Sequence, residues 1–467
     1  MFKKDQKQNL LTSRQREILG HVAKGYTNAE IAHHLCLSEN TIKVHMARLF
    51  HALGVSNRTE AALWFQSSNA KMARPVQKKV TNTLVLIMGE FKSNTLPCGF
   101  LRRIKDQVVS LLSLKTFIDV ILEPDLGDLH KNYFDALILK AGVEQIDSAF
   151  DLNVRIEDYK RHSSIWNQSL SNTSLSGKCL EGWCAQAIAA NAFRLLISHY
   201  QILEPENLDA PIESSCNVIF GLRQLDLRSR QSVGKASRLF AAMLKSNPNH
   251  IFALYGLAAI DYFALVSLYK GDSEEAKTRF IHSHQKLKSL SQCRAESWYV
   301  QALRQILAKN IPGAIFLLKN AIRIDPSFQV FYALLSQLYC FTGEHQKAFE
   351  LMDYGVSLCP EFRYVGSNLV LLSIIFYGLE EYEKSISVLE ESFYLQSPIW
   401  FSRGIYVSSL YMNGQKAKAK EEVKGLQKNL DTVDKAIIQN FIDLLEPKMK
   451  QRLINSLSKV QVFIKAK

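Results

Sequence analysis

The sequence lacks the signatures of several large classes of enzyme. The loop "GEFKSNTLPCG" has no Gly-Lys-Ser/Thr ending, which argues against a P-loop ATPase. No Gly-x-Ser-x-Gly, His-Glu-x-x-His or Rossmann glycine pattern occurs anywhere in the chain. We therefore expect a protein that is not an enzyme and that uses no cofactor and no metal.

Clustered cysteines and a secretory signal are also missing. The eight cysteines are scattered, and none forms a Cys-x-x-Cys pair or joins a Cys/His cluster. In a chain of 467 residues this is typical of buried thiols in a reducing compartment. Because the N-terminus is polar and has no apolar signal stretch, we expect a cytoplasmic protein.

One apolar run is long enough to cross a bilayer. It is "IFALYGLAAIDYFALVSLY", from Ile251 to Tyr269, and its one charged residue is Asp261. A central aspartate is costly in lipid, so we expect a buried helix here and no membrane partner.

The sequence does have an excess of positive charge, and this excess is concentrated near its start. The chain carries a net charge of +13, and residues 1–80 hold 13 Lys and Arg against 5 Asp and Glu, a surplus of eight. Such a concentration is the footprint of a module that binds a polyanion. Composition alone leaves nucleic acid and a lipid surface open as alternatives.

The first seventy residues predict four short helices, each preceded by a capping residue: Thr12, Thr27, Ser38 and Asn57. On the third helix one stripe is apolar and predicts the buried face: Ile42, Met46, Leu49 and Leu53. The opposite face holds Asn40, Lys43, Val44, Ala47, Arg48 and His51. Cations, an amide and small apolar groups suit phosphate and base contacts in a major groove, although an ordinary solvated face would also explain them.

The stretch "LTSRQREILGHVAKGYTNAEIAHHLCLSENTIKVHMARLFHALGVSNRTEAALW" resembles the LuxR-type (GerE-like) helix-turn-helix along its whole length. The resemblance implies a bacterial regulator that binds double-stranded DNA, with a slight preference for an activator. It makes Lys43 a phosphate or base contact, Val44 a base contact and Thr41 a backbone contact. His45 either packs or contacts DNA.

The chain departs from this family pattern at one position. Relatives often carry a basic residue that reads bases where this chain has Ala47, so their operator sequence is not transferred, and we expect Arg48 to supply the charge. In the family the fourth helix often pairs two modules, which would place residues 60–65 at a homodimer contact.

From about residue 214 a helical pattern recurs, with a period near 34 residues and a fixed offset between a small residue and a proline. It resembles tetratricopeptide repeats, which form an α-solenoid. The predicted packing positions are Ala236, Pro248, Ala276, Trp298, Ala314, Pro326, Tyr339, Ala348 and Pro360. The predicted units are 214–248, 251–285, 294–327, 329–361, 366–398 and 400–430. The groove of such an array would hold a protein partner, or the array would mediate self-association.

Residues between the linker and the repeats predict an α/β domain with a partly parallel sheet. Its expected strands are "NTLVLIMGEF", "FIDVILEP", "FDALILKAGV" and "FDLNVRIED", and its first helix is "LPCGFLRRIKDQVVSLLSL". The stretch "NVRIEDYKRHSSIWNQSL" is treated as one strand-forming segment before a closing helix. This order is similar to TolB-N-terminal-like domains.

The expected fold is therefore mainly α and multidomain. The domains are a four-helix LuxR-type module (1–68), a polar linker (69–80), an α/β domain (81–210), tetratricopeptide-like repeats (211–430) and C-terminal capping helices (431–467). The predicted function is sequence-specific transcriptional regulation by a one-component protein. The alternative is a non-catalytic repeat adaptor that binds DNA without sequence preference.

Overall fold

A computed structural model describes most of the chain after residue 83. The described ranges are 84–122, 136–146, 149–159, 163–172, 180–198, 215–227, 230–266, 273–290, 294–364, 368–395, 400–430 and 442–462, with Val22, Ile31, Met46, Val55 and Ala61 before them. The chain forms two compact units. The first comprises Met1–Val80, Ser198–Tyr200 and Leu389–Ile399, and the second comprises Thr81–Ile197, Gln201–Val388 and Trp400–Lys467.

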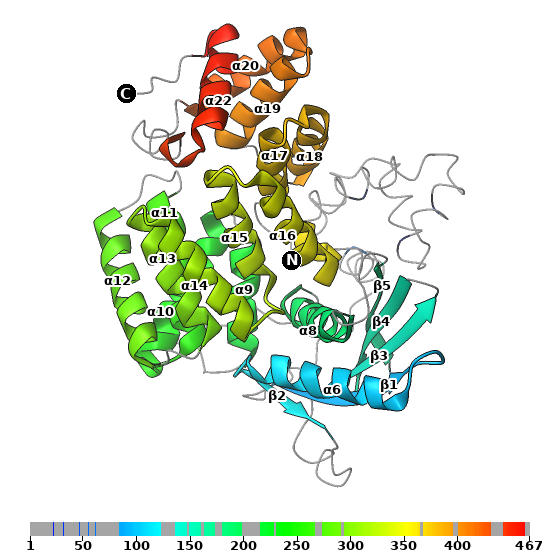
Figure 1. The fold of residues 1–467 in the computed structure, drawn as a ribbon. Coiled ribbons are helices and arrows are strands. Elements are labelled where there is room, and N and C mark those ends of the chain that lie inside the picture. The colour runs from blue at the N-terminus through cyan, green and yellow to red at the C-terminus, as the bar shows by residue number, and fades with distance from the viewer. Residues whose placement is uncertain are drawn as a thin grey trace, which may run out of the picture. The chain divides into compact units, whose positions relative to one another are not determined.

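The second unit contains an open five-stranded sheet (Figure 1). Its strands are β1 (Leu84–Lys92), β2 (Ile118–Ile121), β3 (Leu137–Ile146), β4 (Ala149–Asp158) and β5 (Ser163–Asn172). The strand order is β2-β1-β3-β4-β5. β1 runs parallel to β2 and β3, whereas β3, β4 and β5 form an antiparallel meander. The partly parallel sheet is confirmed, but "NVRIEDYKRHSSIWNQSL" contains parts of two strands where one was expected.

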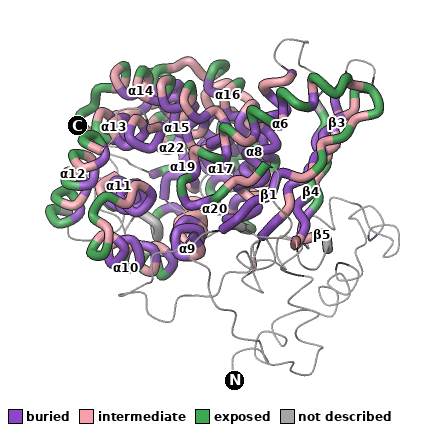
Figure 2. Tube along the Cα trace, turned by 90° about the horizontal axis from the view of Figure 1, so that it is seen from below, coloured by how far each residue is buried: buried purple, intermediate pink, exposed green. Residues whose placement is uncertain are grey.

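Two helices accompany the sheet because each offers apolar residues to the core. Helix α6 (Cys98–Ser113) buries Leu101, Ile104, Val108 and Leu112, which lie three or four residues apart on one face. Helix α8 (Leu180–Ser198) is rich in alanine and is buried along most of its length (Figure 2). Its buried residues fall on several faces of the helix, so α8 is covered on several sides.

The remaining helices follow one another in pairs (Figure 1). They are α9 (Ser215–Leu227), α10 (Arg230–Ser246), α11 (Ile251–Val266), α12 (Ser273–Leu290), α13 (Ala295–Leu307), α14 (Ile311–Ile324), α15 (Gln329–Phe341), α16 (His345–Leu358), α17 (Asn368–Gly378), α18 (Tyr382–Leu395), α19 (Trp400–Met412) and α20 (Lys416–Leu430). A short 3-10 helix, η1 (Pro360–Tyr364), follows α16, and α22 (Pro447–Lys459) closes the described chain. Five of the six predicted repeat ranges each hold two consecutive helices, and α12 runs five residues past the end of the range 251–285.

The turns inside four successive pairs share one geometry. Lys309, Gly343, Glu380 and Gly414 have φ values of 58°, 80°, 64° and 79°. In each turn the amide of the next residue donates to the carbonyl five residues back, at 2.9 Å, as in a Schellman motif. The residue five positions after each turn residue is small and fully buried: Ala314, Ala348, Ser385 and Ala419. The turn and the close approach of the two helices therefore repeat together.

The apolar run that begins at Ile251 is a buried helix, as expected. Asp261 in α11 is fully buried, and its Oδ1 accepts a hydrogen bond from Nη2 of Arg279 in α12 at 2.6 Å. Within the described ranges, no helix combines the length and apolar character needed to cross a membrane.

Candidate nucleic-acid interface

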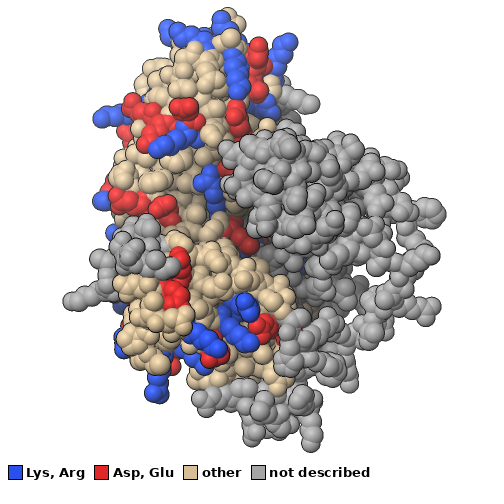
Figure 3. Space-filling view, turned by 90° about the vertical axis from the view of Figure 1, so that its right-hand side faces the viewer, with Lys and Arg blue, Asp and Glu red and all other residues tan. Residues whose placement is uncertain are grey.

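The N-terminal segment has a larger surplus of positive charge than the rest of the chain. After residue 80 the chain holds 44 Lys and Arg against 39 Asp and Glu, a surplus of five. On the face of the second unit drawn in Figure 3, basic and acidic side chains are interspersed. A polyanion-binding surface is therefore expected in residues 1–80, where the surplus is eight.

Four described residues of this segment are helical and buried, and each falls in a different predicted helix. They are Val22, Ile31, Met46 and Ala61. Met46 belongs to the apolar stripe predicted for the third helix. Its burial agrees with the buried face predicted for that helix.

The predicted DNA contacts themselves lie outside the described residues. They are Asn40, Thr41, Lys43, Val44, His45, Ala47, Arg48 and His51. Their roles stay predictions, as does the predicted dimer contact at residues 60–65.

Comparison with known proteins defines the class of this segment. Residues 9–65 match the family described as "Bacterial regulatory proteins, luxR family". This stretch is therefore a LuxR-type helix-turn-helix domain, as the sequence predicted.

Individual relatives match only a short part of this chain. The chain is 49% identical over 55 residues to the CsgBAC operon transcriptional regulatory protein of Escherichia coli K12, which covers 12% of this chain and 26% of that protein. It is 38% identical over 65 residues to the DNA-binding transcriptional activator DevR/DosR of Mycobacterium tuberculosis, covering 14% and 29%. The chain thus spans less than a third of the length of these relatives.

Among solved structures, the yeast Tom70 crystal structure is similar over 78% of this chain and 70% of that chain, with 15% identity and a TM-score of 0.31. A TM-score this low does not define the class of the repeats.

The residues predicted to pack the repeats lie either inside the paired helices or just beyond a helix end. Ala236, Ala276, Ala314 and Ala348 are buried in the second helices of their pairs, and Tyr339 is buried in α15. Trp298 in α13 is partly exposed. Pro248, Pro326 and Pro360 each lie two residues beyond the end of a second helix, α10, α14 and α16. A proline at that position cannot continue the helix, which explains its regular spacing.

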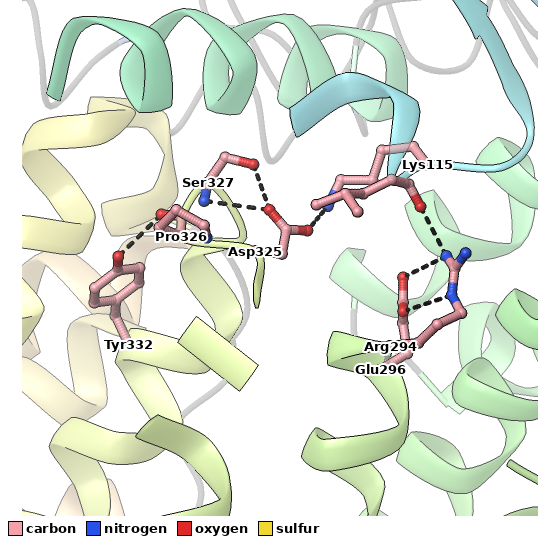
Figure 4. A network of polar contacts seen from close by, with 8 residues as sticks. Lys115, Arg294, Glu296, Asp325, Pro326, Ser327 and Tyr332 are labelled. Atoms are coloured by element: carbon pink, nitrogen blue, oxygen red, sulfur yellow. Dashed lines mark hydrogen bonds and ion pairs between the residues drawn. The ribbon is translucent and has the colours of Figure 1, made fainter. Parts of the chain in front are cut away.

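Sequence reasoning missed a buried ion pair that joins the α/β region to the helix pairs (Figure 4). Lys115 follows α6, and its Nζ contacts the carboxylate of Asp325, 210 residues away in the α14–α15 turn. The two side chains are 1% and 2% exposed. Nζ also lies 4.9 Å and 4.6 Å from the ring centroids of Phe193 and Phe328, where a cation is attracted to the aromatic faces. We call these four residues the junction.

Polar groups around the junction are paired as well. Oδ1 of Asp325 accepts a hydrogen bond from the hydroxyl of Ser327 at 2.7 Å. Nη2 of Arg294 donates to the carbonyl of Leu114 at 2.7 Å, and Nε of Arg294 lies 3.2 Å from Oε2 of the buried Glu296. A cavity of about 20 Å³ beside these groups has room for about one water molecule. The arrangement suits attachment, and no group of residues in the described ranges could hold a metal ion.

Helix α8 strengthens the same attachment through side chains that reach α16. Nε1 of Trp183 donates to the hydroxyl of Ser357 at 3.2 Å, and Nδ2 of Asn191 donates to the carbonyl of Leu358 at 2.7 Å. These contacts join α8 to the end of α16 within the second unit. The alanine-rich pattern of α8 was the one sequence signal of a helix covered on several sides.

Proposed function

We propose that this protein is a bacterial, cytoplasmic, sequence-specific transcriptional regulator. The match of residues 9–65 to the LuxR-type family carries the proposal, because the relatives that share this segment are named as transcriptional regulatory proteins. The concentrated positive charge of residues 1–80 supports the same function, since phosphate contacts supply much of the affinity for DNA.

We assign the recognition role to the third helix of the module. Val44 reads bases, Lys43 and Arg48 contact phosphates or base edges, and Thr41 contacts the backbone near the start of the helix. Because Ala47 replaces a frequent basic residue, the operator preferred by relatives is not carried over to this chain. One relative is named as an activator, and activation is the direction we favour.

We assign the paired helices the role of a tetratricopeptide-like interaction module. It holds a protein partner or joins two copies of the chain. The polar linker at 69–80 lets this association set the local concentration of DNA-binding modules at paired half-sites.

The decisive experiment is chromosome-wide occupancy measured by crosslinking and sequencing. The intact protein is compared with a Lys43→Ala, Arg48→Ala variant, and a Lys71→Ala, Arg74→Ala variant serves as the control because it removes two cations from the predicted linker. We expect sharp peaks for the intact protein and the control, and their loss in the first variant. Binding to the identified site should be about a thousandfold or more tighter than binding to bulk DNA.

Two other outcomes would change the assignment. Diffuse occupancy in all three proteins, with binding that depends only on salt, would favour the adaptor. Sharp peaks that survive the Lys43→Ala, Arg48→Ala substitutions would show that another surface recognises the DNA. The direction of regulation is tested with a reporter gene placed behind the identified operator. If the protein is an activator, reporter expression should fall in the Lys43→Ala, Arg48→Ala variant.

A further inference from the structure

The C-terminal helix α22 crosses several helix pairs, although the sequence predicted a cap on the last one. Glu446 packs against the α15–α16 turn, where a Cβ placed on Gly343 would lie 2.9 Å from Cγ of Glu446. Ten residues later, Ser456 hydrogen-bonds through its hydroxyl to Ser408 of α19. Ten residues of helix extend about 15 Å, whereas neighbouring packed helices lie about 8–10 Å apart. Helix α22 therefore runs across the array (Figure 1).

Between these two contacts, α22 places a cation at the end of α17. Nη1 of Arg452 donates to the carbonyl of Tyr377 at 3.0 Å, and Nη2 donates to Oε1 of Glu380 at 2.7 Å. Carbonyls at a helix C-terminus attract cations, and the Tyr377 ring centroid lies 5.6 Å from Cζ of the same arginine. We call the surface formed by Gly343, Tyr377, Glu380 and Ser408 the α22 seat.

The face of α22 that is turned inward is apolar with a regular spacing. Met449, Leu453 and Leu457 are buried and lie four residues apart, so they form one stripe. Lys448, Gln451, Asn455 and Lys459 on other faces are exposed. An apolar stripe along one face is the pattern by which amphipathic helices dock into grooves.

Helix α22 also carries its own start signal. The carboxylate of Glu446 accepts hydrogen bonds from the amides of Lys448 and Met449 at 2.9 Å and 2.8 Å, and Pro447 occupies the first turn. The helix therefore needs no group of the array to cap it. Beside Glu446, Nδ1 of His345 is buried without a hydrogen bond to any described residue, so α22 does not satisfy every polar group near its seat.

We infer that α22 is a displaceable occupant of its seat, and that the seat is a docking surface for an amphipathic helix of a partner protein. The partner helix carries apolar residues at positions i, i+4 and i+8 and an arginine at i+3, because Met449, Leu453, Leu457 and Arg452 have that spacing in the present occupant. The inference concerns the second unit alone and does not depend on DNA binding.

The test uses the full-length protein and a fluorescent synthetic peptide with the sequence of residues 442–462. Peptide binding is measured by anisotropy to the wild type, to a Leu453→Asp variant and to a Gln451→Asp variant. Leu453→Asp weakens the resident helix, whereas Gln451→Asp places the same charge on its exposed face. We expect the peptide to bind Leu453→Asp at least tenfold more tightly than the wild type or Gln451→Asp. A peptide that itself carries Leu453→Asp should bind none of them.

A milder variant, Arg452→Glu, keeps the test valid if Leu453→Asp fails to fold. It sets a carboxylate against Glu380 and the Tyr377 carbonyl, and it should also admit the peptide. Equal, weak binding to every folded variant would overturn the inference, as would hydrogen exchange in α22 that occurs only when the whole unit unfolds. Formation of dimers by exchange of α22 between copies would overturn the assignment of a partner protein and make a second copy the occupant.

Discussion

The junction and the α22 seat attach two different segments to the same helical array, and both use a cation that meets a carboxylate. At the junction the side chains of Lys115 and Asp325 are 1% and 2% exposed. At the seat the side chains of Arg452 and Glu380 are 17% and 63% exposed. Burial therefore keeps water away from the first ion pair and leaves the carboxylate of the second open to solvent.

The difference follows from what happens when either pair is broken. A buried charge that loses its partner keeps its full desolvation cost, whereas an exposed carboxylate regains water. The junction also encloses the Lys115 ammonium between two aromatic rings, which water cannot replace. The same ionic chemistry thus operates without water at the junction and beside water at the α22 seat.

The largest expected effect comes from breaking the junction. Lys115→Ala should lower the free energy of unfolding by about 3–5 kcal/mol, because it leaves Asp325 buried without its cation. Guanidinium unfolding followed by circular dichroism measures the change. The double variant Lys115→Met, Asp325→Leu is the control, and it should recover most of the loss because no charge remains buried. A single variant as stable as the wild type would refute the assigned role of the junction.

A third ion pair stands between these two extremes, since Asp261 is fully buried but Arg279 is 40% exposed. Burial raises the pKa of Asp261 to about 6, although Arg279 opposes the shift. In the unfolded chain the pKa of an aspartate is about 4. Between about pH 4 and 6 the Asp261 carboxyl is therefore protonated in the folded protein and ionised in the unfolded chain. The contribution of this group to stability is full below about pH 4 and is lost as pH rises to about 6.

The change across this pH window should be about 3 kcal/mol. Urea unfolding of the wild type and Asp261→Asn between pH 4 and 7 isolates the effect as the difference between the two stabilities. That difference should shift against the wild type as pH rises. A constant difference would show that the carboxyl group does not change its proton affinity on folding.

Two glycines with the same backbone geometry differ in their relation to the α22 seat. Gly343 and Gly414 have φ values of 80° and 79°, but a Cβ would meet Glu446 at Gly343 and nothing within 4 Å at Gly414. Gly414→Ala should cost about 1–2 kcal/mol for its left-handed backbone alone. Gly343→Ala should cost more and should speed hydrogen exchange in α22, which Gly414→Ala should not do. Identical exchange in both variants would mean that Gly343 does not support the seat.

The smallest effect is expected at Lys309, which holds the same turn without glycine at a φ of 58°. Lys309→Gly should raise the free energy of unfolding by about 0.5 kcal/mol, because relief of the left-handed strain exceeds the added entropy of the unfolded chain. Thermal unfolding measures the gain, and hydrogen exchange in α22 should not change because Lys309 lies outside the seat. A loss of stability would contradict the strain assigned to this turn.

Much of the architecture could be predicted from local patterns. The turn glycines, the small residues five positions later and the prolines after the second helices predict paired helices, and they do so wherever a glycine marks the turn. Lys309 and Glu380 adopt the same conformation without that signal, so two of the four turns could not be recognised by composition. The polar edge strand β5 has Trp166 and Leu170 as its buried residues, which explains why the sequence alone does not separate it from β4.

The helix-turn-helix and the junction differ in how far each could be predicted from the sequence. The helix-turn-helix is recognisable because its contact residues lie within one short motif. Lys115 stands in an apolar stretch and looks like an ordinary solvent-exposed cation, and its partner Asp325 shares no local pattern with it. Contacts between distant segments depend on the assembled fold, and a single sequence does not carry them.

The distance along the chain between Lys115 and Asp325 has a consequence for biosynthesis. A ribosome that adds about 5–20 residues per second needs roughly 10–40 s to make the 210 residues between them. During that interval the nascent α/β region holds an unpaired lysine between α6 and β2, and the aromatic ring of Phe328 that encloses it does not yet exist. This part of the chain can complete its fold only after α14 and the turn beyond it have emerged.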